Sequence, residues 1–157
     1  MGTTYSVKVV GANVDRDKLQ NAVQMTVDRI NQLMSNYKDD SELSLLNRSA
    51  LDTRFPVSNE TREVLALSAQ IHALSDGAFD ISLGPVVELW GFGPTPTDLR
   101  VPPTEVITEA LSQTGTDGLV LGDVYVQRTR DISLDLSAIA KGYAVDQVAR
   151  MLDSEGY

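Results

Sequence analysis

The segment Ser137–Tyr143 (SAIAKGY) has residue types that could bind an anion. It follows a β-like run, Ile132–Leu136, and precedes a helical pattern, so it is predicted to join a strand to a helix. At such a junction backbone N–H groups can bind phosphate, and the amine of Lys141 adds a positive charge. A strand–turn–helix connection also forms without a ligand, so both interpretations stay open for this segment taken alone.

A second glycine-containing segment, Asp76–Gly84 (DGAFDISLG), directly follows a predicted helix. Small residues surround Phe79 and Asp80, so backbone N–H groups could approach a ligand closely, but a helix C-cap followed by a buried strand is the favoured interpretation of the pattern taken alone. Trp90 and Phe92 flank a glycine a few residues later and could offer an aromatic surface to a planar ring. Large aromatic side chains are more often part of the core, which is the favoured interpretation.

Other residue types that commonly carry chemistry are scarce. His72 is the single histidine, which excludes a multi-histidine metal site within this chain, and its helical context favours a structural or solvated role. Asp39, Asp40 and Glu42 could bind a hard cation such as Mg²⁺ or Ca²⁺. They lack the spacing of an EF-hand loop and are more typical of a solvated acidic loop.

Composition excludes several classes of function. The 157 residues carry 13 basic and 22 acidic side chains, a net charge of −9, which argues against binding of nucleic acid or an anionic membrane. A nucleotide is not excluded, because helix N-termini and bound cations can hold phosphates locally. The chain has no Cys, and therefore no disulfide or thiolate metal site. No apolar run is long enough to span a bilayer, and the first residues lack the pattern of a signal peptide.

The spacing of apolar residues predicts the elements that position these segments. Period-2 alternation predicts a strand with one buried face at Thr3–Val10, and apolar residues three and four apart predict a helix at Asp17–Met34. A loop with one or two helical turns, capped by Ser41, should follow. A second long helix, capped by Ser58 or Asn59, is predicted to have a buried stripe of Val64, Leu67, Ile71 and Leu74. Two more helices are predicted, one capped by Thr104 and running to about Ser112, the other beginning after Ser137.

Three short β-like runs predict an antiparallel meander before the last helix: Gly118–Leu121, Val124–Arg128 and Ile132–Leu136. This order of elements favours the α+β class, with helices packed on a mostly antiparallel sheet. Residues 1–157 are expected to form one domain without an internal boundary. Only one strand precedes the helices, so we expect the sheet to be incomplete in this chain alone.

Two segments together, Asp76–Gly93 and Leu134–Asp146, resemble the most recognisable parts of the N-terminal half of the ApbE-type FAD:protein FMN transferases. Met1–Val9 and Met34–Asn47 resemble two further segments of that family, in the expected order. The resemblance implies an enzyme that binds FAD and uses Mg²⁺ to polarise its pyrophosphate. It would transfer FMN to a Ser or Thr hydroxyl of an acceptor flavoprotein and release AMP.

The same resemblance implies which residues would bind FAD in the first half of the chain. Met1 and Tyr37 would contact the flavin, and Ala78, Phe79 and Asp80 would hold the flavin or adenine portion.

In the second half, Ser137, Lys141 and Tyr143 would line the nucleotide site, and the carbonyl of Ala140 would be a Mg²⁺ ligand. Family members continue past the position of Tyr157 and supply there an acidic residue and a threonine as further metal ligands. We therefore expect this chain alone to be inactive.

Other functions stay open beside the transferase. They are a Mg²⁺-dependent FAD pyrophosphatase in which water replaces the acceptor hydroxyl, a non-catalytic flavin-binding module, and an α+β interaction domain. The resemblance also implies a periplasmic location, in many members with a lipid anchor to the inner membrane. The acceptor flavoprotein and a homo-oligomeric state are left open.

Overall fold

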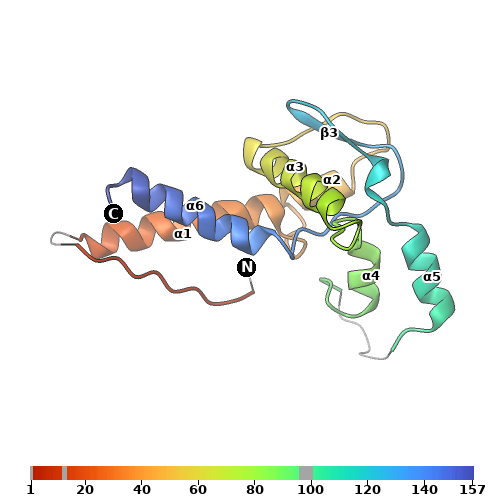
Figure 1. The fold of residues 1–157 in the computed structure, drawn as a ribbon, viewed down its shortest axis with the longest axis horizontal. Helices are drawn as coiled ribbons and strands as arrows, with labels where there is room; N and C mark the ends of the chain where they lie inside the picture. The colour runs from red at the N-terminus through yellow and green to blue at the C-terminus, as the bar shows by residue number, and fades with distance from the viewer. Residues whose placement is uncertain (1, 12–13, 96–100) are drawn as a thin grey trace.

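The computed structural model describes residues 2–11, 14–95 and 101–157, and Figure 1 shows a pair of long helices extending to one side of a small sheet. The pair consists of α1 (Arg16–Met34) and α6 (Ala140–Ser154), which lie side by side and run in opposite directions. Closer to the sheet lie α2 (Glu42–Asn47) and α3 (Asn59–Leu74). In the part of the chain described here, no helix is long and apolar enough to cross a membrane.

The sheet is small and antiparallel. Its strands are β1 (Phe55–Pro56), β2 (Leu119–Leu121) and β3 (Tyr125–Arg128), in the order β1-β3-β2. β2 and β3 are the first two runs of the predicted meander, and Leu121 pairs with Val126. A single 3₁₀ turn, Thr116–Gly118, leads into β2. The predicted α+β class, with helices beside an antiparallel sheet, is confirmed.

Three of the helices, α1, α2 and α3, begin where local sequence signals predicted them. The side chain of Asp15 accepts a hydrogen bond from the Lys18 N–H at 3.0 Å at the start of α1. Ser41 caps α2 by accepting from the Ser44 N–H, and Ser58 caps α3 in the same way. Each cap satisfies one N–H that has no partner within its own helix, which is why these boundaries can be predicted from sequence.

The buried face of α3 differs from the predicted stripe. Val64 and Leu65 are fully buried, whereas Leu67 and Leu74 are exposed. The buried positions are Thr61, Val64, Leu65 and Ser68, which also lie three and four residues apart. The helix was therefore predicted correctly, but its core-facing side was wrong by about one residue.

The third run of the predicted meander, Ile132–Leu136, does not join the sheet. Instead β1 occupies the free edge of β3, through the pair Phe55 and Val126. The backbone of Leu134 makes two hydrogen bonds of 2.9 Å with the side-chain amide of Asn47, one from its N–H and one to its carbonyl. This side chain replaces a neighbouring strand, so the run stays extended and buries Ile132, Leu134 and Leu136 without a ladder.

The predicted strand at Thr3–Val10 is not formed. The described part of this segment is irregular, and Tyr5 and Val7, which should lie on a buried face, are exposed. Its side-chain contact with α1 is a hydrogen bond from the Tyr5 hydroxyl to Gln24 at 2.8 Å. A strand needs a hydrogen-bonded neighbour, and none pairs with this segment among the described residues.

A helix replaces the buried strand that was expected near Gly84. α4 (Gly84–Leu89) lies beside α5 (Thr104–Ser112), which ends at the predicted residue but has Pro103 at its N-cap instead of the predicted Thr104. Leu83 and Ser133 form a single parallel bridge just before α4. Gly84 is required by this contact, because a Cβ placed on it would lie 2.6 Å from the carbonyl oxygen of Ser133.

Gly84→Ala is therefore expected to lower the free energy of unfolding by about 1–3 kcal/mol, since the added methyl group meets backbone rather than a flexible side chain. Gly142→Ala is the matched control, because a Cβ there would meet nothing within 4 Å inside α6. It should raise stability by about 0.5–1 kcal/mol through helix propensity. Urea unfolding followed by circular dichroism measures both, and equal effects would contradict the contact at Gly84.

Candidate functional site

A small pocket lies between the end of α1 and the start of α6. We call it the α1–α6 pocket; its volume is about 100 Å³. It brings together four of the predicted site residues, namely Tyr37, Ser137, Ala140 and Lys141. Gly2 also lines it, whereas the neighbouring Met1, predicted to contact flavin, lies outside the described residues.

The turn that leads into α6 fixes one wall of this pocket. Lys141 donates a hydrogen bond from Nζ to the carbonyl of Ser137 at 2.6 Å, and the Ser137 N–H donates to Asp135 Oδ1 at 2.6 Å. Asp135 is buried, whereas Ser137 and Lys141 are exposed. The ammonium group of Lys141 is therefore held at the start of a helix, where the helix dipole also favours an anion.

Tyr37 forms part of another wall. Its hydroxyl donates to the backbone carbonyl of Phe92 at 2.9 Å, which ties the loop after α1 to the segment after α4. Trp90 and Phe92 are 40% and 72% exposed, so the expectation that both serve as core was wrong. An aromatic surface is thus available next to Tyr37.

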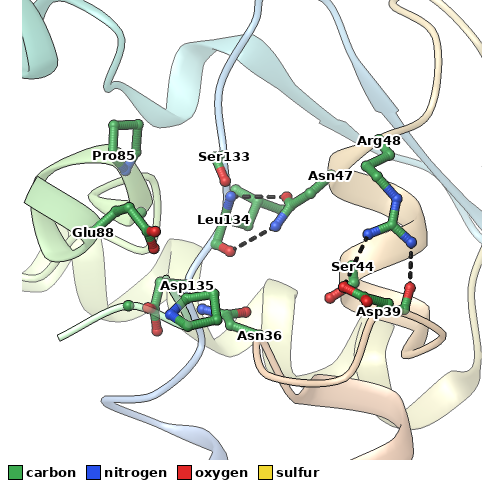
Figure 2. Close-up of a pocket in the computed structure, with 13 residues that line it drawn as sticks. Asn36, Asp39, Ser44, Asn47, Arg48, Pro85, Glu88, Ser133, Leu134 and Asp135 are labelled. Carbon is green, nitrogen blue, oxygen red and sulfur yellow. Dashed lines mark hydrogen bonds and ion pairs between the residues drawn. The ribbon is translucent and has the colours of Figure 1, made fainter. Parts of the chain in front are cut away.

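A larger cavity of about 310 Å³ adjoins this pocket, and Asn36 lines both. We call it the α2–α4 cavity. Figure 2 shows Glu88 of α4 and Arg48, which follows α2, on opposite sides, with the Ser133–Asp135 segment between them. The lining has apolar as well as polar groups and carries both charges, through Asp39, Arg48, Glu88 and Asp135.

Most residues of the α2–α4 cavity were not predicted as site residues from the sequence. Asn47 and Leu134, whose hydrogen bonds shape one wall, are 87 residues apart. Asp135 had a readable signal, because it lies inside the recognised segment Leu134–Asp146 one residue before the turn into α6. Asn36 and Glu88 lie inside two other recognised segments, Met34–Asn47 and Asp76–Gly93, but nothing in the residue pattern singles them out there.

The predicted residues Ala78, Phe79 and Asp80 lie after α3 and line neither the pocket nor the cavity. Ala78 is exposed, and Phe79 packs partly buried against the core. The Asp80 carboxylate accepts hydrogen bonds from the N–H and the hydroxyl of Ser82, at 2.7 and 2.6 Å. The side chain of Asp80 is thus engaged within its own turn.

Tyr143 is also placed apart from the pocket. It is buried, and its hydroxyl donates to Glu63 of α3 at 2.7 Å. Burial, together with this hydrogen bond, raises the pKa of the Tyr143 hydroxyl. The neutral phenol therefore joins α6 to α3.

The ApbE family model matches residues 1–157 of the chain. The chain belongs to the ApbE family. It is 38% identical to the FAD:protein FMN transferase of Salmonella typhimurium and 36% identical to that of Escherichia coli K12, in each case over 99% of this chain and 46% of the relative. The chain thus spans about half the length of the curated relatives it matches.

Solved structures of the ApbE family share the fold. The flavin transferase ApbE from Vibrio cholerae superposes with a TM-score of 0.87 and 35% identity, over 91% of this chain and 47% of that one. The apo form of Pseudomonas stutzeri flavinyl transferase ApbE gives a TM-score of 0.86 and 33% identity, over 94% and 48%. The resemblance drawn from four sequence segments is confirmed.

FAD stands in the name of the relatives, and the described residues offer groups suited to only part of such a dinucleotide. Lys141 offers a cation for phosphate and Tyr37 an aromatic face, but the pocket alone, about 100 Å³, is below the usual range for organic ligands. The α2–α4 cavity, at about 310 Å³, is at the lower end of that range. A dinucleotide would therefore extend beyond either one.

Mg²⁺ does not fit the described residues by themselves. They contain no group of three His, Cys, Asp or Glu side chains that could hold a metal ion. In the acidic loop considered above, Glu42 instead accepts hydrogen bonds from the N–H and hydroxyl of Ser58, and the exposed Asp39 carboxylate lies 4.0 Å from the guanidinium of Arg48. The carbonyl of Ala140 is one oxygen, whereas Mg²⁺ takes about six.

Proposed function

We propose that the chain forms the FAD-binding part of an enzyme that transfers FMN from FAD to a Ser or Thr hydroxyl of an acceptor flavoprotein. One observation carries the proposal: Tyr37, Ser137, Ala140 and Lys141, chosen by their positions in family motifs, converge on one pocket. The relatives' name, FAD:protein FMN transferase, supports it.

The proposed reaction is a phosphoryl transfer. The acceptor oxygen attacks the phosphorus on the FMN side of the FAD pyrophosphate, and the bond to the bridging oxygen breaks. AMP leaves with that oxygen, and the hydroxyl proton is released. In an acidic chain the local cation at Lys141 and the N–H groups at the start of α6 offset the charge of the pyrophosphate.

The test uses the longest natural form of the protein and, separately, residues 1–157. Each is mixed with FAD, Mg²⁺ and an acceptor flavoprotein, and covalent FMN is measured by mass spectrometry. Transfer by the longer form supports the proposal. AMP release without acceptor would favour the FAD pyrophosphatase, and stable FAD binding without turnover would favour a binding module. Neither binding nor transfer in the longer form would overturn the proposal.

Lys141→Met is expected to weaken FAD binding by about 10- to 150-fold, because one charge-assisted hydrogen bond to phosphate contributes on the order of 1.5–3 kcal/mol. Its hydrogen bond to Ser137 lies within one exposed turn, so the fold should be retained. Lys8→Met removes the same charge from an exposed position that does not line the α1–α6 pocket, and should bind FAD normally. Fluorescence titration with FAD measures the affinity of both variants. Equal affinities of the two would show that Lys141 does not contribute to FAD binding.

We also propose a periplasmic location, as in the family members that the sequence resembles. Fractionation of cells that carry the natural gene tests it, because recovery of the protein with cytoplasmic markers would contradict it.

A further inference from the structure

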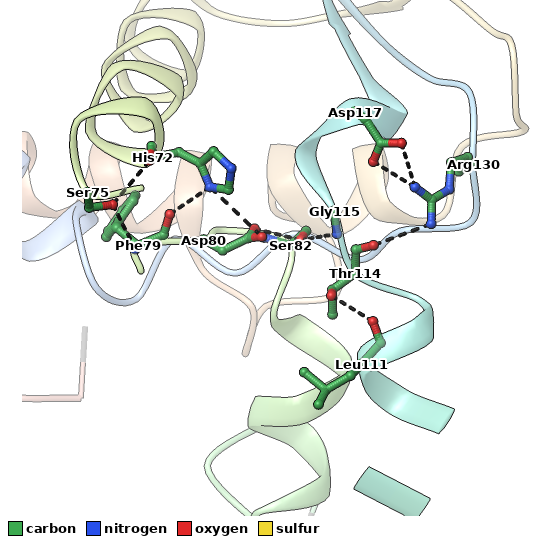
Figure 3. A network of polar contacts seen from close by, with 10 residues as sticks. All are labelled: His72, Ser75, Phe79, Asp80, Ser82, Leu111, Thr114, Gly115, Asp117 and Arg130. Carbon is green, nitrogen blue, oxygen red and sulfur yellow. Dashed lines mark hydrogen bonds and ion pairs between the residues drawn. The ribbon is translucent and has the colours of Figure 1, made fainter. Parts of the chain in front are cut away.

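The backbone of Phe79 is held on both sides by side chains from the end of α3. Its N–H donates to Ser75 Oγ at 3.0 Å, and its carbonyl lies 2.8 Å from His72 Nδ1 (Figure 3). A carbonyl oxygen can only accept, so Nδ1 carries the hydrogen of this bond. The hydroxyl of Ser75 in turn donates to the carbonyl of His72 at 3.2 Å.

These contacts stabilise a turn that would not persist by itself. Asp76 and Gly77 have φ angles of 51° and 81°, both in the left-handed region. That region is unfavourable for a residue with a side chain such as Asp76, so the surroundings must hold it. The N–H of Gly77 donates to the carbonyl of His72 at 2.9 Å, which anchors the turn to the same residue.

The other end of the segment is held by the buried Ser82. Its N–H and hydroxyl bind the Asp80 carboxylate, and its oxygen accepts from the Gly115 N–H at 2.7 Å. The second carboxylate oxygen of Asp80 lies 3.9 Å from His72 Nδ1. The segment Phe79–Ser82 is thus fixed from both of its ends.

This segment connects directly to the candidate site. The carbonyl of Ile81 accepts a hydrogen bond of 2.7 Å from the N–H of Asp135, which lines the α2–α4 cavity. The carboxylate of Asp135 holds Ser137 in the α1–α6 pocket. A shift of Phe79 would therefore be transmitted along the backbone through Asp80 and Ile81 to Asp135, which lines the α2–α4 cavity.

We propose that His72 and Ser75 are positioning residues for the FAD site, acting through Phe79, Ile81 and Asp135. The proposal rests on the proposed function and adds residues that sequence analysis assigned no part in it. His72 lines neither the pocket nor the cavity, so it acts by fixing the backbone and not by contacting the reacting atoms.

The test compares His72→Ala, His72→Asn and Ser75→Ala in the longest natural form of the protein. We expect His72→Ala to raise KM for FAD about 10-fold with kcat changed less than about 3-fold, the pattern of lost ground-state binding. Asn places an N–H donor near the position of Nδ1, so His72→Asn should restore KM to within about 3-fold. Ser75→Ala should raise KM like His72→Ala, and it supplies the result if His72→Ala fails to fold.

Val23→Ala is the control for stability, because Val23 is a buried residue of α1 that lines neither the pocket nor the cavity. It should lower the unfolding temperature without changing KM for FAD. Either of two results would overturn the inference: an unchanged KM in both His72→Ala and Ser75→Ala, or equal KM values in His72→Ala and His72→Asn. If the wild type is active, neither result affects the proposed function. A wild type without FAD binding or transfer would overturn both.

Discussion

Leu65→Ala is expected to lower the free energy of unfolding by about 3–5 kcal/mol, because it leaves a cavity in a core that can relax only partly. Leu65 is 0% exposed and packs in one cluster with Leu43, Leu46 and Val126, which come from α2 and β3. The lost contacts thus join three elements that are distant in the sequence. Urea unfolding followed by circular dichroism measures the change.

Leu74→Ala is the matched control, since it makes the same substitution in the same helix at a side chain that is 88% exposed. It should change stability by no more than about 0.5 kcal/mol. If Leu74→Ala were the more damaging of the two, the buried face of α3 would be the stripe predicted from sequence and not the one in the structure.

The difference between these two leucines shows what the sequence could predict in α3. Its start was predictable because the cap at Ser58 is a local hydrogen bond to the Thr61 N–H. Its buried face was not, because Leu65 and Leu67 are equally apolar and only the neighbours packed against the helix decide between them. Those neighbours are set by tertiary structure.

Strands show the same limit more strongly. β2 and β3 are close in sequence and were predicted, whereas β1 pairs with β3 across about 70 residues and was missed. Ile132–Leu136 has the alternation of a strand, yet the amide of Asn47 takes the place of a partner strand. Period-2 alternation reports which side chains are buried, but not what satisfies the backbone.

The candidate site was predicted through family resemblance and not through spacing. Tyr37 and Lys141 are 104 positions apart, and no periodicity relates them, yet both line the α1–α6 pocket. Tyr143 lies only two residues after Lys141, but the helical turn directs it to Glu63 of α3. Membership in a motif thus indicates the segment, and the fold decides which side chains of the segment reach the pocket.

Arg128→Met is the second substitution for which we expect a large loss, about 2–5 kcal/mol in the free energy of unfolding. Arg128 is 4% exposed, and its guanidinium donates to the carbonyls of Ile132 and Ser49, at 2.7 and 2.6 Å. Methionine fills a similar volume but cannot donate, so both carbonyls would be left without this donor. Thermal unfolding and urea unfolding should agree on the loss.

Arg130→Met removes the same charge two residues further along the chain. Arg130 is exposed and pairs with Asp117 at 2.6 Å, so its loss should cost no more than about 1 kcal/mol. Both variants remove one guanidinium. The difference between their losses in the free energy of unfolding therefore measures the effect of burial separately from the effect of charge. If Arg128→Met cost no more than Arg130→Met, the two carbonyl contacts would contribute little. The Ile132–Leu136 run would then be held by Asn47, by its backbone contacts with Ile81 and Leu83, and by core packing.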